Sequence, residues 1–519
     1  EEGVDAGHAV EAERGPRGRA ERDQAAGIPR ARDGGAFARE LAVFASQMAA
    51  YYGPAAPGGG EAALLRCVED AALPAEGYRL TVSPAAIEVA ASSGAGAFHG
   101  LQTARQLLLS GAEGFPLRPG QGAAARFRVP CVRIEDAPAF SWRGFMLDCS
   151  RHFYTVAFIE KILDVMALHH LNIFHWHLTD DQGWRLPVPE YPLLTEIGAK
   201  RLNPFKQKEV YTEGFYSEDD IRRIVAFAAA RHITVVPEVD LPGHTSAALA
   251  AYPDLGCTGG PYQVEYRHGV FKDILCAGND ALFTFTGAIF DTLARLFPGP
   301  YVHIGGDEAP TERWEACPRC RARQEALGLG ESRLLQRWLT RRFVEMLRER
   351  GKTAIGWDEV MEASEGGGGD CTALPSGLIV MFWRSHADYH GKEQLLEAAS
   401  RQGRRIIMTP NGHGAYLDYR QRDDPGEPGA WRVSTLEQSY YLRLAVPGVA
   451  EELVLGGQGN LWAESIASDP VAEYLAFPRL CALSEALWSK ERDYADFRTR
   501  LASHSLRLDA LNVTHCRVF

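Results

Sequence analysis

Eight short apolar segments recur along most of the chain, and stretches with helical spacing separate them. A strand that is buried on both faces of a parallel sheet appears as a continuous hydrophobic run. Eight such strands with intervening helices make a (β/α)8 TIM barrel, and we predict this α/β fold. The segments are RGFMLDCS (143–150), LNIFHWHL (171–178), HITVVPEVD (232–240), YVHIGGDE (301–308), TAIGW (353–357), LIVMFW (378–383), RRIIMTP (404–410) and ELVLGGQG (452–459).

A different pattern precedes the barrel. FARELAVFASQMAAYY and GAFHGLQTARQLLLS have helical periodicity, whereas YRLTVS and AIEVAAS alternate as strands do. We therefore predict a small α+β domain at residues 36–130, which ends in the linker LRPGQGAAARFRVP. The barrel is expected to span 131–519 and to end in a C-terminal helical segment. Residues 1–35 are rich in Glu, Arg, Gly and Ala and are predicted to be a disordered extension.

Charge and composition exclude several classes of protein. The net charge of -12 argues against a nucleic-acid partner. No window of about 18 uninterrupted apolar residues predicts a membrane span. The first residues, EEGVDAGHAV, lack the apolar core of a signal peptide. The chain is therefore either cytoplasmic, or secreted, periplasmic or lysosome-like after a signal has been trimmed.

The ten cysteines are too few for a disulfide scaffold in a chain of 519 residues. Cys317-Pro-Arg-Cys320 has the spacing of half a zinc site or of a redox pair. No second CxxC motif accompanies it, so we expect neither a metal nor a cofactor. Cys257 and Cys276 flank a Gly-rich loop and are candidates for a local disulfide.

Polar and aromatic residues follow the predicted strands, and the active site of such a barrel lies at the C-terminal strand ends. Two adjacent carboxylates, Asp307 and Glu308, end one segment, although neighbouring like charges raise at least one pKa. Cleavage of a glycosidic bond needs an acid at the leaving oxygen and negative charge near the oxocarbenium ion. Side chains of neighbouring residues diverge on an extended strand, so the pair can address two atoms of one substrate.

Three tryptophans, Trp357, Trp383 and Trp462, follow three different segments and predict an aromatic pocket for a sugar. Arg151 offers a rigid fork of donors for hydroxyl groups. Carboxylates at the strand ends can accept hydrogen bonds from the same groups. The expected partner is therefore a carbohydrate.

The segments resemble the conserved blocks of glycoside hydrolase family 20, the β-N-acetylhexosaminidases. The blocks are HIGGDEA, RGFMLDCSRHF, LNIFHWHLTDDQGWR, VVPEVDLPGH, GW, YLD, LWAE and AFPRL, in family order over roughly residues 131–490. The resemblance implies an exo-acting, retaining enzyme that hydrolyses terminal non-reducing β-linked GlcNAc or GalNAc from a glycan or glycoconjugate. It also implies substrate-assisted catalysis, in which the 2-acetamido group attacks its own anomeric carbon and forms an oxazolinium ion.

The resemblance also implies roles for the catalytic residues. Glu308 is the general acid and later the base, and Asp307 orients the acetamido N–H. Tyr416 donates to the acetamide oxygen, while Asp180 and His244 form a relay that tunes Glu308. These roles require a raised pKa at Glu308 and an ionised Asp307.

The binding roles follow from the same resemblance. Arg151 binds the 3- and 4-hydroxyls, and Asp418 and Glu464 bind the 4- and 6-hydroxyls. Trp357, Trp383 and Trp462 enclose the acetamido methyl and the sugar face. The loop between Cys257 and Cys276 resembles a stretch that is disulfide-bonded in some relatives.

Two other functions compete with this one. His175, His177 and His244, together with the carboxylate pair, are candidate ligands of a metal-dependent barrel hydrolase. The histidines His175 and His177 also fit a supporting role inside the barrel. The second rival is a carbohydrate-binding homologue that has lost turnover.

Overall fold

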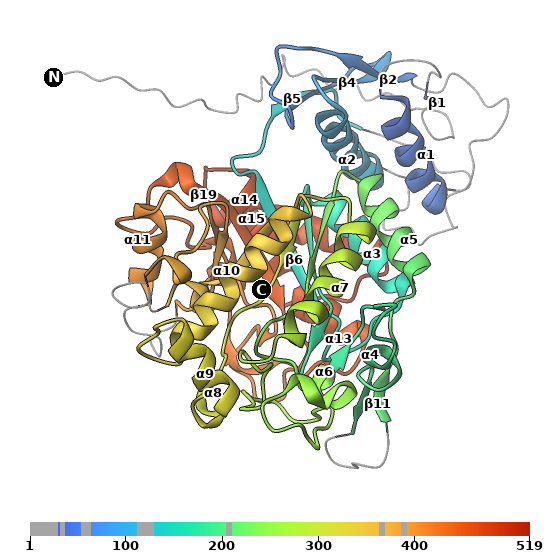
Figure 1. Ribbon diagram of the computed structural model, residues 1–519. Coiled ribbons are helices and arrows are strands. Elements are labelled where there is room, and N and C mark those ends of the chain that lie inside the picture. Colours follow the sequence, from blue (N-terminus) through green and yellow to red (C-terminus); the bar gives the residue numbers. More distant parts are fainter. Residues whose placement is uncertain are drawn as a thin grey trace.

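The computed structural model describes residues 30–31, 37–52, 64–111, 129–203, 210–362, 369–385 and 392–518. Its main body is a closed barrel of eight parallel strands (Figure 1), as predicted. Each strand overlaps one of the eight predicted segments, although β6 begins one residue before its segment and β19 ends two residues after its own. The strands are β6 (Trp142–Asp148), β7 (Ile173–His177), β12 (Thr234–Glu238), β13 (Tyr301–His303), β14 (Thr353–Trp357), β15 (Ile379–Phe382), β16 (Ile406–Met408) and β19 (Val454–Leu461).

The last strand closes the barrel onto the first. β19 pairs with β6 in register from Gly456–Trp142 through Leu461–Leu147. Every residue of β6 and β7 is buried, because side chains of one strand face alternately the barrel interior and the surrounding helices. The continuous apolar runs of the sequence are therefore the consequence of burial on both faces.

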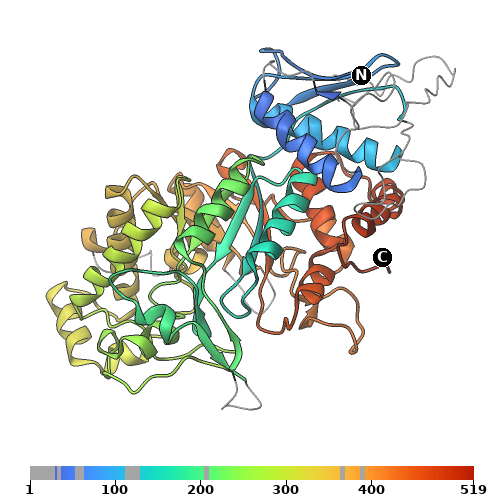
Figure 2. The ribbon, with the colours of Figure 1, turned by 90° about the vertical axis from the view of Figure 1, so that its right-hand side faces the viewer.

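Helices cover the outside of the barrel (Figure 2). Helix α5 shows how the sequence fixes a boundary: the Ser217 hydroxyl accepts from the Asp220 N–H at 3.1 Å, and the Asp220 carboxylate accepts from the Ser217 N–H at 2.9 Å. The helices that follow barrel strands are α3 (Val156–Leu168), α5 (Glu218–Ala229), α7 (Ala281–Leu296), α10 (Arg333–Glu349), α11 (Glu393–Arg401) and α14 (Arg479–Trp488). The last helix is α15 (Tyr494–Ala510).

A smaller domain lies beside the barrel. Its five-stranded sheet has the order β1-β2-β4-β3-β5, with two helices packed against it (Figure 2). The elements are β1 (Arg30–Ala31), α1 (Ala38–Tyr52), β2 (Leu64–Glu69), β3 (Tyr78–Val82), β4 (Ala86–Ala91), α2 (Gly94–Gly111) and β5 (Val132–Asp136).

The limits of the small domain differ from those predicted. β5 pairs with β3 from Val132 to Asp136, so the sheet extends past the predicted limit at residue 130. Within the predicted disordered extension, residues 30–31 form β1, and the other residues before 37 lie outside the described residues. Most of the predicted linker also lies outside them. Neither β2 nor β5 was predicted: β2 lacks clear alternation, and β5 lies beyond the predicted limit of the domain.

Buried arginines join the two domains. Arg143 at the start of β6 makes a bidentate ion pair with Glu76, with distances of 2.9 and 3.0 Å. Arg105 on α2 donates to Asp164 on α3 at 2.7 Å. Because Arg143 belongs to the N-terminal end of its strand, the small domain leaves the opposite end of the barrel free.

The long connections lie at that free, C-terminal end. Among the described residues, no helix combines the length and apolarity needed to cross a lipid bilayer. The elements of these connections are β8 (Thr179–Asp180), β9 (Gly183–Trp184), α4 (Leu193–Glu196), β10 (Lys200–Leu202), β11 (Val210–Glu213), α6 (Ser246–Ala251), η1 (Pro253–Leu255), α8 (Glu312–Ala316), α9 (Pro318–Ala326), η2 (Asp358–Met361), η3 (Gly369–Thr372), β17 (Tyr419–Arg420), β18 (Ala430–Val433), α12 (Leu436–Tyr440) and α13 (Asp469–Ala476). A further turn, η5 (Glu451–Leu453), precedes β19.

Candidate active site

The carboxylate pair Asp307 and Glu308 lies in a loop, and not on a strand as the sequence suggested. β13 ends at His303, and the backbone then turns through Gly305, whose φ is 65°. A Cβ atom on Gly305 would lie 1.8 Å from Asp240 Oδ1, so only glycine fits. Glu308 has a φ of 46°, which is uncommon outside glycine and is typical of strained functional positions. A turn, and not strand alternation, therefore directs the two carboxylates.

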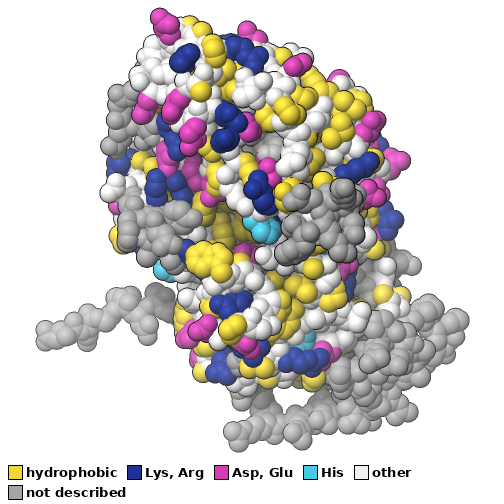
Figure 3. All heavy atoms as spheres, turned by 90° about the horizontal axis from the view of Figure 1, so that it is seen from below, with side chains coloured by type: hydrophobic (Ala, Val, Ile, Leu, Met, Phe, Trp, Pro, Cys, Tyr) yellow, Lys and Arg dark blue, Asp and Glu magenta, His cyan; other side chains and the backbone are white. Residues whose placement is uncertain are grey.

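A cavity of about 540 Å³ opens at the C-terminal end of the barrel. Seen from below, the surface is hollowed near its centre, and hydrophobic side chains line the hollow (Figure 3). Ten of the eleven predicted site residues line this cavity, and Asp180 is buried beneath it. The ten are Arg151, His244, Asp307, Glu308, Trp357, Trp383, Tyr416, Asp418, Trp462 and Glu464.

Aromatic rings form the walls of the cavity. The ring centroids of Trp357 and Trp462 are 5.8 Å apart, and those of Tyr416 and Trp462 are 6.3 Å apart. Trp383 stacks on Tyr416 with an interplanar angle of 15° and a centroid distance of 6.2 Å. Rings in such contact leave a slot with apolar faces, which suits a methyl group or the C–H face of a sugar.

Buried carboxylates fix two of these tryptophans. Trp357 Nε1 donates to Glu238 Oε1 at 2.9 Å, and Trp383 Nε1 donates to Glu359 Oε2 at 3.0 Å. A tryptophan in a core has its polar N–H satisfied in this way, and the ring is then held in one orientation. The walls are therefore rigid before any ligand binds.

Arg151 is held at one side of the cavity by several groups. Its Nη2 lies 2.8 Å from Asp180 Oδ2, and its Nε donates to Gln182 Oε1 at 2.9 Å. The guanidinium carbon lies 5.3 Å from the ring centroid of Trp462, and Nη2 is 3.9 Å from Glu464 Oε1. The fixed guanidinium offers hydrogen-bond donors beside an acceptor, Glu464, which is the arrangement that vicinal hydroxyls require.

His244 lies between two acidic groups below the cavity and the carboxylate pair within it. Its Nδ1 is 3.1 Å from Asp180 Oδ1 and 3.1 Å from Asp181 Oδ2. Its Nε2 is 3.6 Å from Glu308 Oε2 and 3.8 Å from Asp307 Oδ2. Burial alone would lower the pKa of His244, but the nearby carboxylates raise it well above its usual value. The ring is therefore an imidazolium in the free protein.

The pKa values of the pair are the reverse of those expected. Burial and the neighbouring Asp240 raise the pKa of Asp307 well above its usual value. Burial also acts to raise the pKa of Glu308, but the nearby positive charges of His244 and Arg151 outweigh it, so this pKa is lowered. Burial raises the pKa of Asp240 to about 7. The expectation of a raised pKa at Glu308 is therefore wrong for the free protein, where Asp240 and Asp307 are the carboxyl groups with raised pKa values.

A second polar network lies under the cavity. Glu238 Oε2 is 2.5 Å from His177 Nδ1 and 3.0 Å from His175 Nε2, and Glu238 Oε1 is 3.0 Å from His303 Nδ1. All four side chains are buried, and none of them lines the cavity. This placement agrees with the supporting role considered for the two strand histidines.

Several residues that line the cavity were not predicted from the sequence. Trp431 on β18 is 75% exposed and extends the aromatic lining outwards. β18 is not one of the barrel strands, and a single tryptophan outside the predicted strand ends gives no signal in a sequence. The other unpredicted lining residues are His268, Asn411, Tyr419, Gly429, Ala430, Arg432, Ser465 and Ile466.

A carboxylate pair, aromatic walls and groups for hydroxyls at the mouth of a parallel barrel define a glycoside hydrolase site. The chain belongs to glycosyl hydrolase family 20. The model of the family's catalytic domain matches residues 140–491, and the model of its domain 2 matches residues 28–137.

Relatives and solved structures agree with this family. A β-hexosaminidase of Porphyromonas gingivalis is 40% identical over 454 residues, which are 86% of this chain and 55% of that protein. One of Akkermansia muciniphila is 34% identical over 446 residues, 85% of each chain. A mutant Streptomyces plicatus β-hexosaminidase in complex with its product GlcNAc superposes with a TM-score of 0.80 at 28% identity, over 96% of this chain and 94% of that one. The chain thus spans about half the length of the Porphyromonas relative.

Proposed function

We propose that this chain is an exo-acting, retaining β-N-acetylhexosaminidase that removes terminal β-linked GlcNAc or GalNAc from glycans. The observation that carries the proposal is Asp307 Oδ1, a buried acceptor without a hydrogen-bond partner in the described part of the chain. It lies in a cavity walled by Trp357, Trp383 and Trp462. A 2-acetamido group supplies both the missing N–H donor and a methyl group for the aromatic slot.

The arrangement supports attack by the substrate itself. The acetamido oxygen forms a bond to the anomeric carbon while the bond to the leaving oxygen breaks, and that oxygen takes a proton from Glu308. The product is an oxazolinium ion, whose positive charge Asp307 opposes as a carboxylate. Water then attacks the anomeric carbon and gives a proton to Glu308, which restores the acetamide and retains the configuration.

The reaction needs a protonated Glu308 and an ionised Asp307, and the free protein can reach this protonation state. Asp240 has a pKa of about 7 and can hold the shared proton while Asp307 is ionised. A bound sugar displaces water from Glu308, which is half-buried in the free protein, and desolvation raises its pKa. His244 Nε2, 3.6 Å away, can supply the proton.

The remaining groups fit the sugar hydroxyls. Asp418 Oδ1 is a second buried acceptor without a partner among the described residues, and it lines the same cavity. Arg151 and Glu464 offer donors and an acceptor at the neighbouring side. A cavity with these groups on its inner side suits the non-reducing end of a glycan, which supports exo-action.

The rival metal hydrolase fits the geometry less well. His175, Glu238 and His303 have ligand atoms close enough to hold a metal ion, but they are buried below the cavity and do not line it. Asp240, His244 and Asp307 also lie close together, but nearby carboxylates raise the pKa of His244 well above its usual value, and a metal needs a neutral imidazole as its ligand. A catalytic metal needs an open coordination position that substrate or water can reach. A non-catalytic binding protein would have no need of the carboxylate pair beside the aromatic slot.

His244→Gln is expected to move the alkaline limb of the kcat/KM profile to higher pH. The imidazolium lowers the pKa of Glu308, whereas burial and Asp180 raise it, so removal of the positive charge lets this pKa rise. An opposite charge at this range shifts a carboxyl pKa by about one to three units. The check is a pH–rate series, with His232→Gln as the control because His232 pairs with Glu40 in the small domain, at 2.9 Å. An unmoved limb, or one displaced to lower pH, contradicts the role given to His244.

The proposed activity is tested with three aryl glycosides: β-GlcNAc, β-GalNAc and β-glucoside. Compared with the β-GlcNAc substrate, each of the other two differs at one position of the sugar. We expect turnover of β-GlcNAc and β-GalNAc substrates, and loss of about a thousandfold or more for the β-glucoside, which lacks the internal nucleophile. Initial rates at equal substrate concentration measure this. Efficient cleavage of the β-glucoside would overturn the proposed mechanism, and failure to cleave any of the three would support a binding protein.

A further inference from the structure

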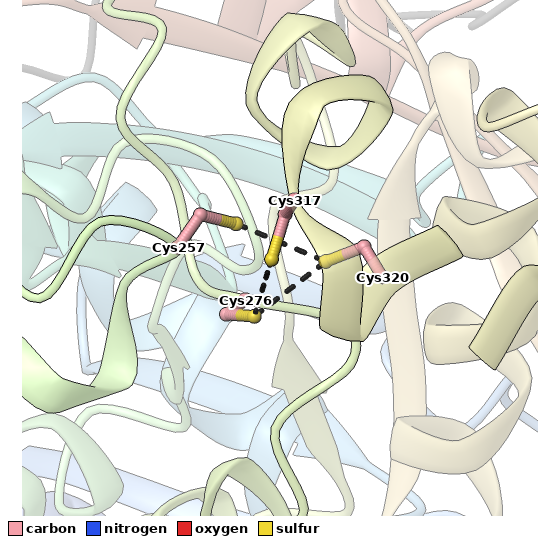
Figure 4. Close-up of side chains that lie close together, drawn as sticks. All are labelled: Cys257, Cys276, Cys317 and Cys320. Carbon is pink, nitrogen blue, oxygen red and sulfur yellow. Dashed lines mark hydrogen bonds between the residues drawn. The ribbon is translucent and has the colours of Figure 1, made fainter. Parts of the chain in front are cut away.

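Four cysteines from the connections that follow β12 and β13 lie close together (Figure 4). The sulfur atoms of Cys257, Cys276, Cys317 and Cys320 all lie within 4.8 Å of one another. The Sγ–Sγ distance is 3.8 Å from Cys257 to Cys320, 3.8 Å from Cys276 to Cys317 and 3.5 Å from Cys276 to Cys320. Cys276, Cys317 and Cys320 are buried, and Cys257 is partly exposed.

The spacing is that of a metal site. A tetrahedral Zn²⁺ with Zn–S bonds of about 2.3 Å places neighbouring sulfurs about 3.8 Å apart. A disulfide bond is about 2.05 Å long and joins only two of the four. We propose that these cysteines bind one Zn²⁺ as a closed site of four thiolates. With four protein ligands and no open position, the site is structural and not catalytic.

The surroundings favour thiolates. The backbone N–H of Gly278 lies near the sulfur atoms of Cys276 and Cys320. Gly278 packs so closely that a Cβ atom there would lie 2.2 Å from the carbonyl carbon of Arg319. Cys317 precedes the first turn of α9, where the helix dipole favours negative charge. These contacts suit the close sulfur-to-backbone packing of a metal-binding turn.

The charges also balance. Four thiols release their protons to solvent when Zn²⁺ binds, which leaves a complex with a net charge of about -2. Arg319 lies between two of the ligands in the sequence, contacts the Cys317 side chain and donates to the Gly256 oxygen at 2.9 Å. Its guanidinium offsets part of the negative charge, as outer-shell groups of metal sites do.

The position of the site suggests what the metal does. Cys257 and Cys276 belong to the connection after β12, which carries His244. Cys317 and Cys320 belong to the connection after β13, which carries Glu308. The metal would therefore tie together the two loops on which the acid and its positioning residue lie.

Other contacts join the same two loops. Trp314 Nε1 donates to the Leu275 oxygen at 2.9 Å, and Arg313 pairs with Asp273 at 2.6 Å. Leu275 N in turn donates to the oxygen of Pro242 at 3.1 Å. Loss of the metal is thus expected to loosen both loops and not to remove a reacting group.

The sequence analysis expected no metal because only one CxxC motif is present. The other two ligands lie far apart in the chain, and the antiparallel bridge between Gly256 and Leu275 places their backbones side by side. The sequence offered a Cys257–Cys276 disulfide instead, because these two cysteines flank a Gly-rich loop. In the structure both residues have Cys320 as a neighbour.

The test is the metal content of the full chain, purified without chelator and measured by inductively coupled plasma mass spectrometry. We expect about one zinc per chain, and its loss in Cys320→Ser. The matched control is Cys131→Ser, because Cys131 is an exposed cysteine outside the cluster. Absence of metal from the wild-type chain, or a peptide map in which Cys257 and Cys276 form a disulfide, overturns the proposal.

A second measurement keeps the proposal testable if Cys320→Ser does not fold. The wild-type chain, grown with Co²⁺ in place of zinc, is expected to show the intense visible bands and sulfur-to-metal charge-transfer absorption of tetrahedral cobalt thiolate. Cobalt that binds with the weak spectrum of an octahedral oxygen site contradicts a site of four thiolates. Neither readout depends on glycosidase activity, so the two proposals can fail separately.

Discussion

Glu308→Gln lowers kcat/KM for a GlcNAc glycoside with an alkyl leaving group by about a hundred- to ten-thousandfold, the range expected for loss of a general acid. The loss is smaller for aryl glycosides whose leaving groups need no proton. Glutamine keeps the shape of the side chain but cannot give its proton to the leaving oxygen. Rates across a series of leaving groups with different pKa values, at one pH, measure the effect.

A matched control separates this effect from a change of loop charge. Glu312→Gln removes an exposed carboxylate from the same connection, and its kinetic constants are expected to match those of the wild type. Thermal unfolding of both variants shows whether the loop is intact. An equal loss for alkyl and aryl substrates in Glu308→Gln, or no loss for either, rules out the acid role.

The barrel strands could be predicted although a short apolar run can be either a strand or a buried helix segment. Eight such runs that alternate with helical stretches indicate parallel strands. TAIGW and HITVVPEVD lie between strands on both sides and under helices, so every position favours an apolar residue. Polar residues interrupt the pattern mainly at the strand ends, where the active site lies. The same pattern, an apolar run that ends in polar residues, therefore predicted both the strands and the position of the active site.

The small domain was harder to predict because its sheet has one face covered by helices. β3 and β4 alternate clearly and were found, whereas β2, LLRCVE, has polar residues at irregular positions. β5 follows a stretch outside the described residues, and its sequence VRIED was assigned to the barrel. Its pairing with β3 depends on contacts distant in sequence, which periodicity does not reveal.

The details of the site depend on backbone turns that the sequence did not indicate. HIGGDE reads as a strand that continues to its carboxylates, yet the chain leaves the sheet at His303. The two glycines were read as part of a buried strand, whereas their positive φ values mark a turn. Similarly, the pKa of Glu308 is set by His244, which belongs to a different connection of the barrel.

The cysteine cluster illustrates the same limit for metal sites. A zinc motif is recognisable when its ligands come in two closely spaced pairs. Here one pair is Cys317 and Cys320, while Cys257 and Cys276 are brought together only by the bridge between their loops. Tertiary contacts can therefore bring together metal ligands whose spacing in the sequence does not match a known motif.

Asp307→Asn is expected to lower kcat by about a hundred- to a thousandfold, as loss of a charge that stabilises a transition state does. Unlike Glu308→Gln, it should affect activated aryl substrates as strongly as alkyl substrates, because formation of the oxazolinium ion accompanies the departure of every leaving group. Asparagine resembles the protonated Asp307 of the free protein, so KM should change much less than kcat. A plot of rate against leaving-group pKa measures both points.

A different dependence on the leaving group in Glu308→Gln and Asp307→Asn would be the strongest evidence that the two carboxylates have separate roles. Asp254→Asn is the matched control, because Asp254 is exposed in the connection after β12, and its rates should be unchanged. Wild-type rates for Asp307→Asn on an activated substrate would show that the carboxylate does not oppose the developing cation. The raised pKa of Asp307 would then mean that this carboxyl stays protonated throughout the reaction and has a structural role only. A protonated carboxyl provides no negative charge for catalysis.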